Sequence, residues 1–91
     1  MTKELRIKIG AKIRSHRVAI GLTQLQLSKQ LGYDSMQFVS LFERGLSQVP
    51  AKKLNQVCSI LKINKKSIAD QIVKDFRENL LKEMSDVENN I

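Results

Sequence analysis

Residues 23–45 read TQLQLSKQLGYDSMQFVSLFERG. Leu27 and Leu31 are one helical turn apart, so this stretch predicts a first short helix that buries one face. Thr23 precedes the helix and is a favoured N-cap residue, while Gly32 follows it in the position of a helix stop. The stretch therefore opens with a short predicted helix that has a start signal and a stop signal.

A second short helix follows after the turn at Tyr33 and Asp34. Ser35 is the predicted N-cap, Val39 and Phe42 form the inner face, and Gly45 ends the helix. Two short helices joined by a short turn that contains glycine have the spacing of a helix-turn-helix. In that motif the first helix holds the second away from the body, where its polar face fits the major groove of DNA.

Helical periodicity continues on both sides of this stretch. It predicts a helix over 4–19 that Gly21 ends, a helix whose first turn contains Pro50, and a helix over 65–84 capped by Asn64. Strand signals are absent, so we expect an all-α, five-helix protein. The inward residues of the first and fourth helices are Leu5, Ile9, Ile13, Leu54, Val57, Cys58 and Leu61.

Charge is distributed unevenly along the 91 residues. Residues 1–66 hold thirteen Lys and Arg against three acids, a net charge of +10, whereas residues 67–91 have a net charge of −3. A strongly basic domain favours a polyanionic partner, with nucleic acid ahead of an anionic membrane surface. Charge alone leaves simple solubility open as an explanation.

The remaining composition excludes several classes of protein. Cys58 is the only cysteine, so no intramolecular disulfide can form, which is typical of the reducing cytoplasm. Neither a membrane-spanning run nor the apolar core of a signal peptide is present, so we expect a cytoplasmic protein without membrane association. His16 is a lone histidine and Cys58 is interpreted as a core residue. We expect no metal, no cofactor, no catalytic residue and no enzymatic activity.

Several segments together resemble the XRE family, the family of phage Cro and repressor DNA-binding domains. They are IGAKIR at 9–14, Arg17, GLTQ at 21–24, LSKQLG at 27–32, FERG at 42–45, and 54–61. The resemblance covers about residues 5–64. It implies a bundle of the phage repressor DNA-binding type, here with an extended C-terminal helix.

The resemblance also implies roles for individual residues. Gln24 matches the family's phosphate-clamping glutamine, and Arg17 and Glu43 match a structural ion pair between the first and third helices. On the third helix, Gln37 can bond adenine or guanine, and Met36 or Leu41 can touch a thymine methyl group. The residues expected to contact DNA are Thr23, Gln24, Ser35, Met36, Gln37, Ser40, Leu41 and Arg44.

Two departures from the family pattern affect the expected DNA contacts. Tyr33 and Asp34 stand where the family usually has one turn residue, which tilts the third helix or lengthens the turn. Met36, Phe38 and Leu41 make the outer face of that helix unusually apolar. Exposed apolar clusters can also bind protein. A protein-interaction module, such as an antitoxin-like partner of a second protein, therefore remains the alternative to a DNA-binding regulator.

The C-terminal segment, residues 65–91, is read as an amphipathic helix followed by an acidic tail that frays from Ser85. It follows the helix-turn-helix domain, which spans residues 3–64, and packs on it. The apolar stripe either serves the core of the same chain or forms a dimer interface. We expect a homodimer that reads a palindrome in double-stranded DNA. The predicted interface residues are Ile72, Phe76, Leu80 and Met84.

Overall fold

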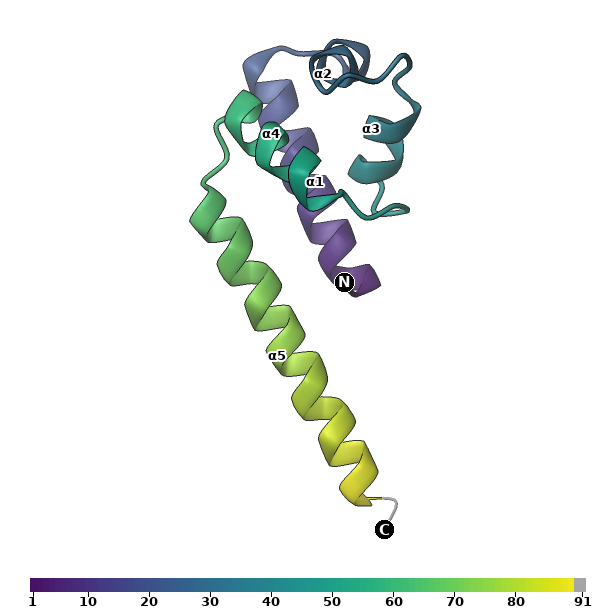
Figure 1. The fold of residues 1–91 in the computed structure, drawn as a ribbon, viewed down its shortest axis with the longest axis vertical. Coiled ribbons are helices and arrows are strands. Elements are labelled where there is room, and N and C mark those ends of the chain that lie inside the picture. The colour runs from purple at the N-terminus through teal and green to yellow at the C-terminus, as the bar shows by residue number, and fades with distance from the viewer. Residues whose placement is uncertain (90–91) are drawn as a thin grey trace.

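The computed structural model describes the fold of residues 1–89 and the side chains of residues 1–85. Within residues 1–89 it contains five helices and no strand, which confirms the predicted all-α class. Figure 1 shows helices α1 to α4 gathered into a compact body and helix α5 extending from it. The helices are α1 (Lys3–Ile20), α2 (Gln24–Gln30), α3 (Gln37–Glu43), α4 (Ala51–Leu61) and α5 (Lys65–Asn89).

Local capping explains where most of these helices begin and end. The Thr23 hydroxyl accepts the Gln26 amide, and the Gln26 side chain accepts the Thr23 amide in return, which completes a capping box at α2. Gly21 ends α1 with a φ of 88°, a left-handed conformation that glycine adopts without a steric penalty. The Asn64 side chain accepts the Ser67 amide at 3.0 Å and thereby caps α5 as predicted.

Two predicted helix starts are wrong by a short distance. Helix α3 begins at Gln37 with Met36 as its N-cap, so Ser35 is not the cap. The Ser35 hydroxyl still accepts the Gln37 amide at 3.3 Å, because the longer turn places it just outside the helix. Pro50 is the N-cap of α4 and does not lie within its first turn. Its ψ of 143° is extended, and the helix begins at Ala51.

One hydrophobic core joins all five helices. The inward residues predicted for α1 and α4 are buried, except that Leu54 is only partly buried. Burial raises the pKa of the Cys58 thiol, so that this side chain packs as a neutral group. The buried hydrophobic residues are Leu5, Ile9, Ile13, Leu27, Leu31, Val39, Phe42, Val49, Val57, Cys58, Leu61, Ile63 and Ile68.

Helix α1 and the end of α3 approach each other very closely at Gly10. A Cβ atom at this position would lie 2.3 Å from the carbonyl oxygen of Phe42 and 2.7 Å from that of Glu43. Gly45 lies just beyond α3 with a φ of 69°, and a Cβ there would come within 2.8 Å of the backbone of Ile7. Both glycines therefore set how deeply the end of α3 sits against α1.

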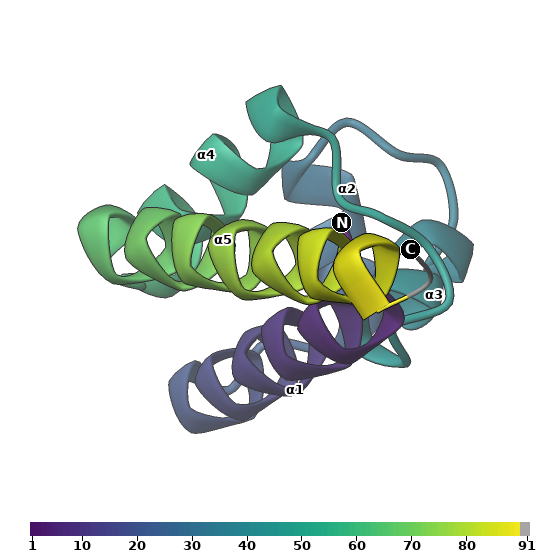
Figure 2. The same cartoon turned by 90° about the horizontal axis from the view of Figure 1, so that it is seen from below.

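Helix α5 runs antiparallel to α1, as the two views in Figures 1 and 2 show together. Lys12 donates to Ser67 at 3.3 Å near the start of α5, and Thr2 donates to Asp75 at 3.0 Å further along. Beyond Asp75 the helix continues past the N-terminus of the chain, which gives the molecule its extents of 52 × 24 × 20 Å.

Helix α5 extends to Asn89, five residues beyond the predicted end at Met84. Asn90 and Ile91, the last residues of the predicted frayed tail, lie outside the described residues. No helix within residues 1–89 combines the length and hydrophobicity needed to cross a bilayer.

Candidate nucleic-acid interface

Helices α2 and α3 pack together and leave one face of α3 turned outward. Leu27 of α2 and Val39 and Phe42 of α3 are buried, so the opposite side of α3 is free to meet a partner. The residues on or beside this outward face are Met36, Gln37, Phe38, Ser40, Leu41 and Arg44. Helix α3 stands at the edge of the body in Figure 1, and Gln37 and Arg44 on this face are exposed.

The additional turn residue is accommodated by an aromatic stack. The ring of Tyr33 lies 4.7 Å from that of Phe38, with 24° between the ring planes. The Lys53 ammonium lies 5.0 Å from the centre of the Tyr33 ring and also donates to the Leu31 carbonyl at the end of α2. Phe38, although 47% exposed, therefore has a neighbour within the chain that holds one side of its ring.

A buried ion pair joins the end of α1 to the end of α3. Arg17 donates to both carboxylate oxygens of Glu43, at 2.6 and 3.0 Å, and also to the Leu22 carbonyl at 2.8 Å. The side chains of Arg17 and Glu43 are only 11% and 3% exposed. Hydrogen bonding to Glu43 raises the pKa of Arg17, so the guanidinium stays charged.

Gln24 belongs to the same network, a contact that the sequence did not predict. Its side-chain amide donates to Glu43 at 3.1 Å from the first turn of α2. The amide nitrogen has a second hydrogen that this bond does not use. Gln24 as a whole is partly exposed.

The other residues predicted to contact DNA lie around the same surface. Gln37 and Arg44 are exposed, whereas Ser40 and Leu41 are partly exposed on the same face of α3. The Arg44 side chain bonds the Ser40 carbonyl at 3.3 Å, which leaves most of its guanidinium donors free. Thr23 and Ser35 are exposed at the two helix starts, where their hydroxyls accept backbone amides.

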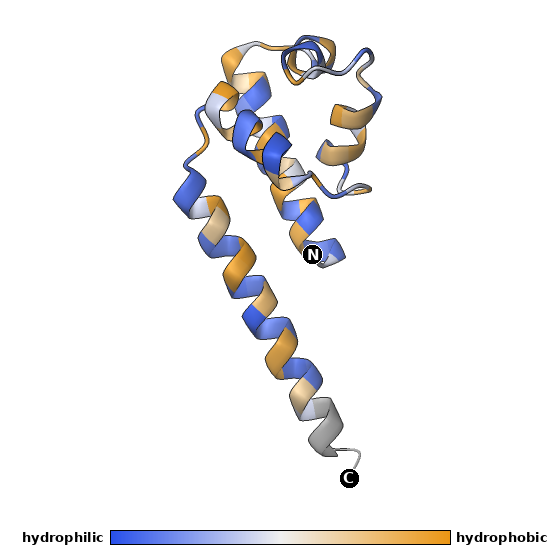
Figure 3. Cartoon of the chain, viewed as in Figure 1, coloured by the Kyte–Doolittle hydropathy of each residue, from blue (hydrophilic) through white to orange (hydrophobic). Residues whose placement is uncertain are grey.

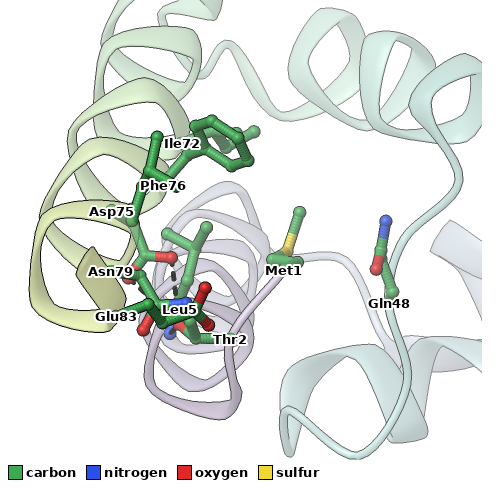
Figure 4. Close-up of a pocket in the computed structure, with 10 residues that line it drawn as sticks. Met1, Thr2, Leu5, Gln48, Ile72, Asp75, Phe76, Asn79 and Glu83 are labelled. Atoms are coloured by element: carbon green, nitrogen blue, oxygen red, sulfur yellow. Dashed lines mark hydrogen bonds between the residues drawn. The ribbon is translucent and has the colours of Figure 1, made fainter. Parts of the chain in front are cut away.

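The four residues predicted to form a dimer interface lie along one side of α5. Ile72 is partly buried against the core, but Phe76, Leu80 and Met84 are exposed. Ile72, Phe76 and Leu80 line a groove of about 530 Å³ between α5 and the start of α1, where Thr2 bonds Asp75 (Figure 4). Figure 3 shows apolar and polar segments alternating along α5, and the residues of the stripe beyond Ile72 remain exposed beside this groove.

Solved structures provide the relevant comparisons, since no family model and no curated protein matches the chain by sequence. The restriction-modification controller protein C.AhdI from Aeromonas hydrophila superposes with a TM-score of 0.64 at 26% identity. That match covers 72% of this chain and 94% of the controller.

The clp gene regulator ClgR from Corynebacterium glutamicum is similar as well. Two of its structures match with TM-scores of 0.65 and 0.64 at 28% and 26% identity. The first covers 77% of this chain and 88% of the regulator, and the second covers 88% and 89%. By their descriptions, both neighbours are regulatory proteins.

Proposed function

This chain resembles the XRE family of helix-turn-helix regulators in motif and in fold, and from that premise we propose that it regulates transcription. It is a cytoplasmic repressor that binds a short palindromic operator in double-stranded DNA as a homodimer. The observation that carries the proposal is the outward face of α3, where Gln37, Ser40 and Arg44 are accessible on a domain whose residues 1–66 have a net charge of +10.

Phosphate contacts would come from the start of α2 and from the basic residues around α3. Unpaired backbone N–H groups at the start of a helix favour an anion, and Gln24 adds a side-chain donor at that point. Arg44 extends the positive surface at the far end of α3. These contacts would orient the protein on the duplex without selecting a sequence.

Base contacts would come from Gln37 on the first turn of α3. Its side chain is exposed, and a glutamine can form two hydrogen bonds to adenine in the major groove. The Arg17–Glu43 pair and the close approach at Gly10 support this function indirectly. They fix the orientation of α3 relative to α1.

The dimer is proposed to form through the exposed end of α5. Phe76 is 68% exposed, and Val73, Leu80, Leu81 and Met84 on the same helix are exposed as well. Clusters of exposed apolar side chains are typical of protein interaction surfaces. A second copy is the proposed occupant because a two-fold interface would bring the exposed stripe of one copy against the same stripe of its partner. Reading a palindrome requires the two copies of α3 to lie about one DNA turn apart.

The alternative is a protein-interaction module whose α3 surface holds a second protein. The observation in its favour is the apolar character of Met36, Phe38 and Leu41 on or beside that surface. Tyr33 accounts for Phe38 within the chain, which weakens the alternative.

A DNA-binding assay at several salt concentrations tests the proposal. Each phosphate that the protein neutralises contributes a slope of about −0.9 to the dependence of log affinity on log salt. We expect a steep fall in affinity for a mixture of random duplexes, and a residual specific affinity for a duplex selected from a random-sequence pool. A flat salt dependence, or failure to select any duplex, would contradict the proposed function.

A further inference from the structure

The charge of Lys53 is directed to groups of its own chain. Lys53 lies in the first turn of α4, and its ammonium group donates to the carbonyl oxygen of Leu31, the C-cap residue of α2. The same ammonium lies 5.0 Å from the centre of the Tyr33 ring. Both groups attract a cation, because the end of a helix and the face of an aromatic ring are negative. Lys53 therefore joins α4 to the point where α2 passes into the turn.

The Tyr33 ring connects this point to α3. It stacks on Phe38 with 4.7 Å between the ring centres and lies 6.3 Å from the ring of Phe42. Phe38 is in the first turn of α3, and Phe42 belongs to the buried core. Aromatic pairs at these distances attract each other beyond the effect of their buried area. A single lysine on α4 thus contacts the end of α2 and a ring that packs against two residues of α3.

The neighbouring residue, Lys52, has a different environment. Lys52 is exposed, whereas Lys53 is partly buried. A lysine that contacts a DNA phosphate needs its ammonium group directed at the duplex. The ammonium of Lys53 is already engaged by a carbonyl oxygen and a ring, which favours a role inside the protein over a phosphate contact.

We propose that Lys53 is a positioning residue for DNA recognition, which acts through Tyr33 to hold the start of α3 in the orientation that the specific duplex requires. Gln37, the proposed base-contacting residue, directly precedes Phe38, so a shift of the Phe38 ring would move it. This inference rests on the proposed DNA-binding function. It adds a residue outside the two helices of the helix-turn-helix that determines specificity without contacting DNA.

Removing the ammonium group tests this role in binding. Lys53→Met keeps the apolar stem, and Lys52→Met removes the same charge from the next position as the matched control. In Lys53→Met the ratio of the affinities for selected and random duplexes should fall about tenfold, as expected for losing a charged hydrogen bond and a cation–π contact. Lys52→Met should keep this ratio. Lys53→Arg should restore it, because a guanidinium also donates hydrogen bonds and packs on aromatic rings.

The salt dependence distinguishes positioning from a phosphate contact. Each phosphate contact contributes a slope of about −0.9 to the dependence of log affinity on log salt. Lys53→Met should keep the slope of the unaltered protein, because no phosphate contact is lost.

Tyr33 provides a readout that does not depend on DNA. It is the only tyrosine of the chain, which has no tryptophan, so the tyrosine band of the near-ultraviolet circular dichroism arises from this residue. Lys53→Met should change the intensity of this band while the far-ultraviolet spectrum stays the same. Lys53→Arg should restore the band, and Lys52→Met should leave it unchanged.

Tyr33→Leu tests the same contact from its other side. Because Lys53 acts partly through the ring, the double variant Tyr33→Leu, Lys53→Met should lose less specificity than the two single losses combined. Fully additive losses would show that the two residues act independently, and would overturn the proposal.

The results separate this inference from the function on which it rests. If the unaltered protein binds no DNA, the proposed function and the role of Lys53 in recognition are both overturned. If it binds DNA and Lys53→Met keeps the ratio of selected to random affinity, only the role of Lys53 is overturned. A shallower salt dependence in Lys53→Met would identify a phosphate contact, and an unchanged tyrosine band would show that Lys53 does not hold the ring. Either result would also overturn the role of Lys53 alone.

Discussion

At the scale of the residue, the network of Arg17, Glu43 and Gln24 links stability to recognition. The Glu43 carboxylate accepts bonds from two side chains that belong to different helices, α1 and α2, while it sits on α3 itself. Gln24 also lies where a phosphate contact is proposed. The same side chain therefore stabilises the fold and belongs to the proposed phosphate contact.

Removing one partner of the buried pair should be costly. In Arg17→Met the nearly fully buried Glu43 carboxylate loses its cation, and we expect the free energy of unfolding to fall by about 3–5 kcal/mol. The double variant Arg17→Met, Glu43→Leu should recover most of this loss, because no buried charge remains. Urea denaturation followed by circular dichroism measures both. A cost below about 1 kcal/mol for the single variant would mean that water screens the pair as at the surface.

Substitutions of the two glutamines should separate base contacts from phosphate contacts. Gln37→Ala should weaken the selected duplex by about 1–3 kcal/mol and leave random DNA almost unaffected, because one base contact is lost. Gln24→Ala should weaken both duplexes alike and should also lower stability, because Glu43 loses a hydrogen bond. Titrations of folded protein measure these effects. Equal losses on both duplexes for Gln37→Ala would show that this residue does not read bases.

At the scale of the element, local signals were sufficient for most of the fold. Capping residues and helical periodicity predicted α1, α2 and α4 closely, because each depends on neighbours within a few positions. The N-cap of α3 was predicted one residue too early, at Ser35 instead of Met36. The bond between Gln24 and Glu43 was not predicted, because the family resemblance gave Gln24 only a phosphate-contacting role.

The junction of α1 and α3 depends on the absence of a side chain at Gly10. In Gly10→Ala the new methyl group would overlap two main-chain carbonyls, and we expect a loss of about 2–3 kcal/mol despite the better helix propensity of alanine. Gly21→Ala is the control. Its φ of 88° costs about 1–2 kcal/mol, but no atom lies within 4 Å of the new group. Thermal denaturation should rank Gly10→Ala as the less stable variant, and the reverse order would contradict the close contact.

At the scale of the whole molecule, α5 divides into a part that packs on the body and a part that is exposed. Its first turns bury Ile68 and part of Ile72, and Asp75 ties it to the start of α1. The later turns expose an apolar stripe that the rest of the chain does not cover. Periodicity predicted the stripe but not where its contact with the core ends, because that point depends on the position of α1.

Placing charges on the exposed stripe should separate the protomers. The double variant Phe76→Lys, Leu80→Lys should be monomeric and retain its helical content, because neither residue belongs to the core. Burying each of these two apolar side chains at an interface would stabilise the dimer by about 1.5–3 kcal/mol. The variant should bind single half-sites weakly and lose its preference for paired ones. Sedimentation velocity decides the oligomeric state.

Glu78→Lys is the matched control, because it adds the same charge at an exposed position on the other side of α5. It should remain dimeric. A wild-type protein that is monomeric at high micromolar concentration would contradict dimerisation through α5. Loss of helical content in the double variant would show that Phe76 and Leu80 stabilise the fold of the single chain instead of a dimer.

The contact at Gly10 also has a consequence for how this sequence can evolve. Every other amino acid is larger than glycine, and the atoms that a larger residue would meet are carbonyl oxygens of Phe42 and Glu43. Those oxygens are part of the backbone, so no exchange of side chains at 42 or 43 can make room. A larger residue at position 10 can therefore be accommodated only by a shift of the backbone between α1 and the end of α3. We expect chains that keep this close approach to keep glycine at position 10.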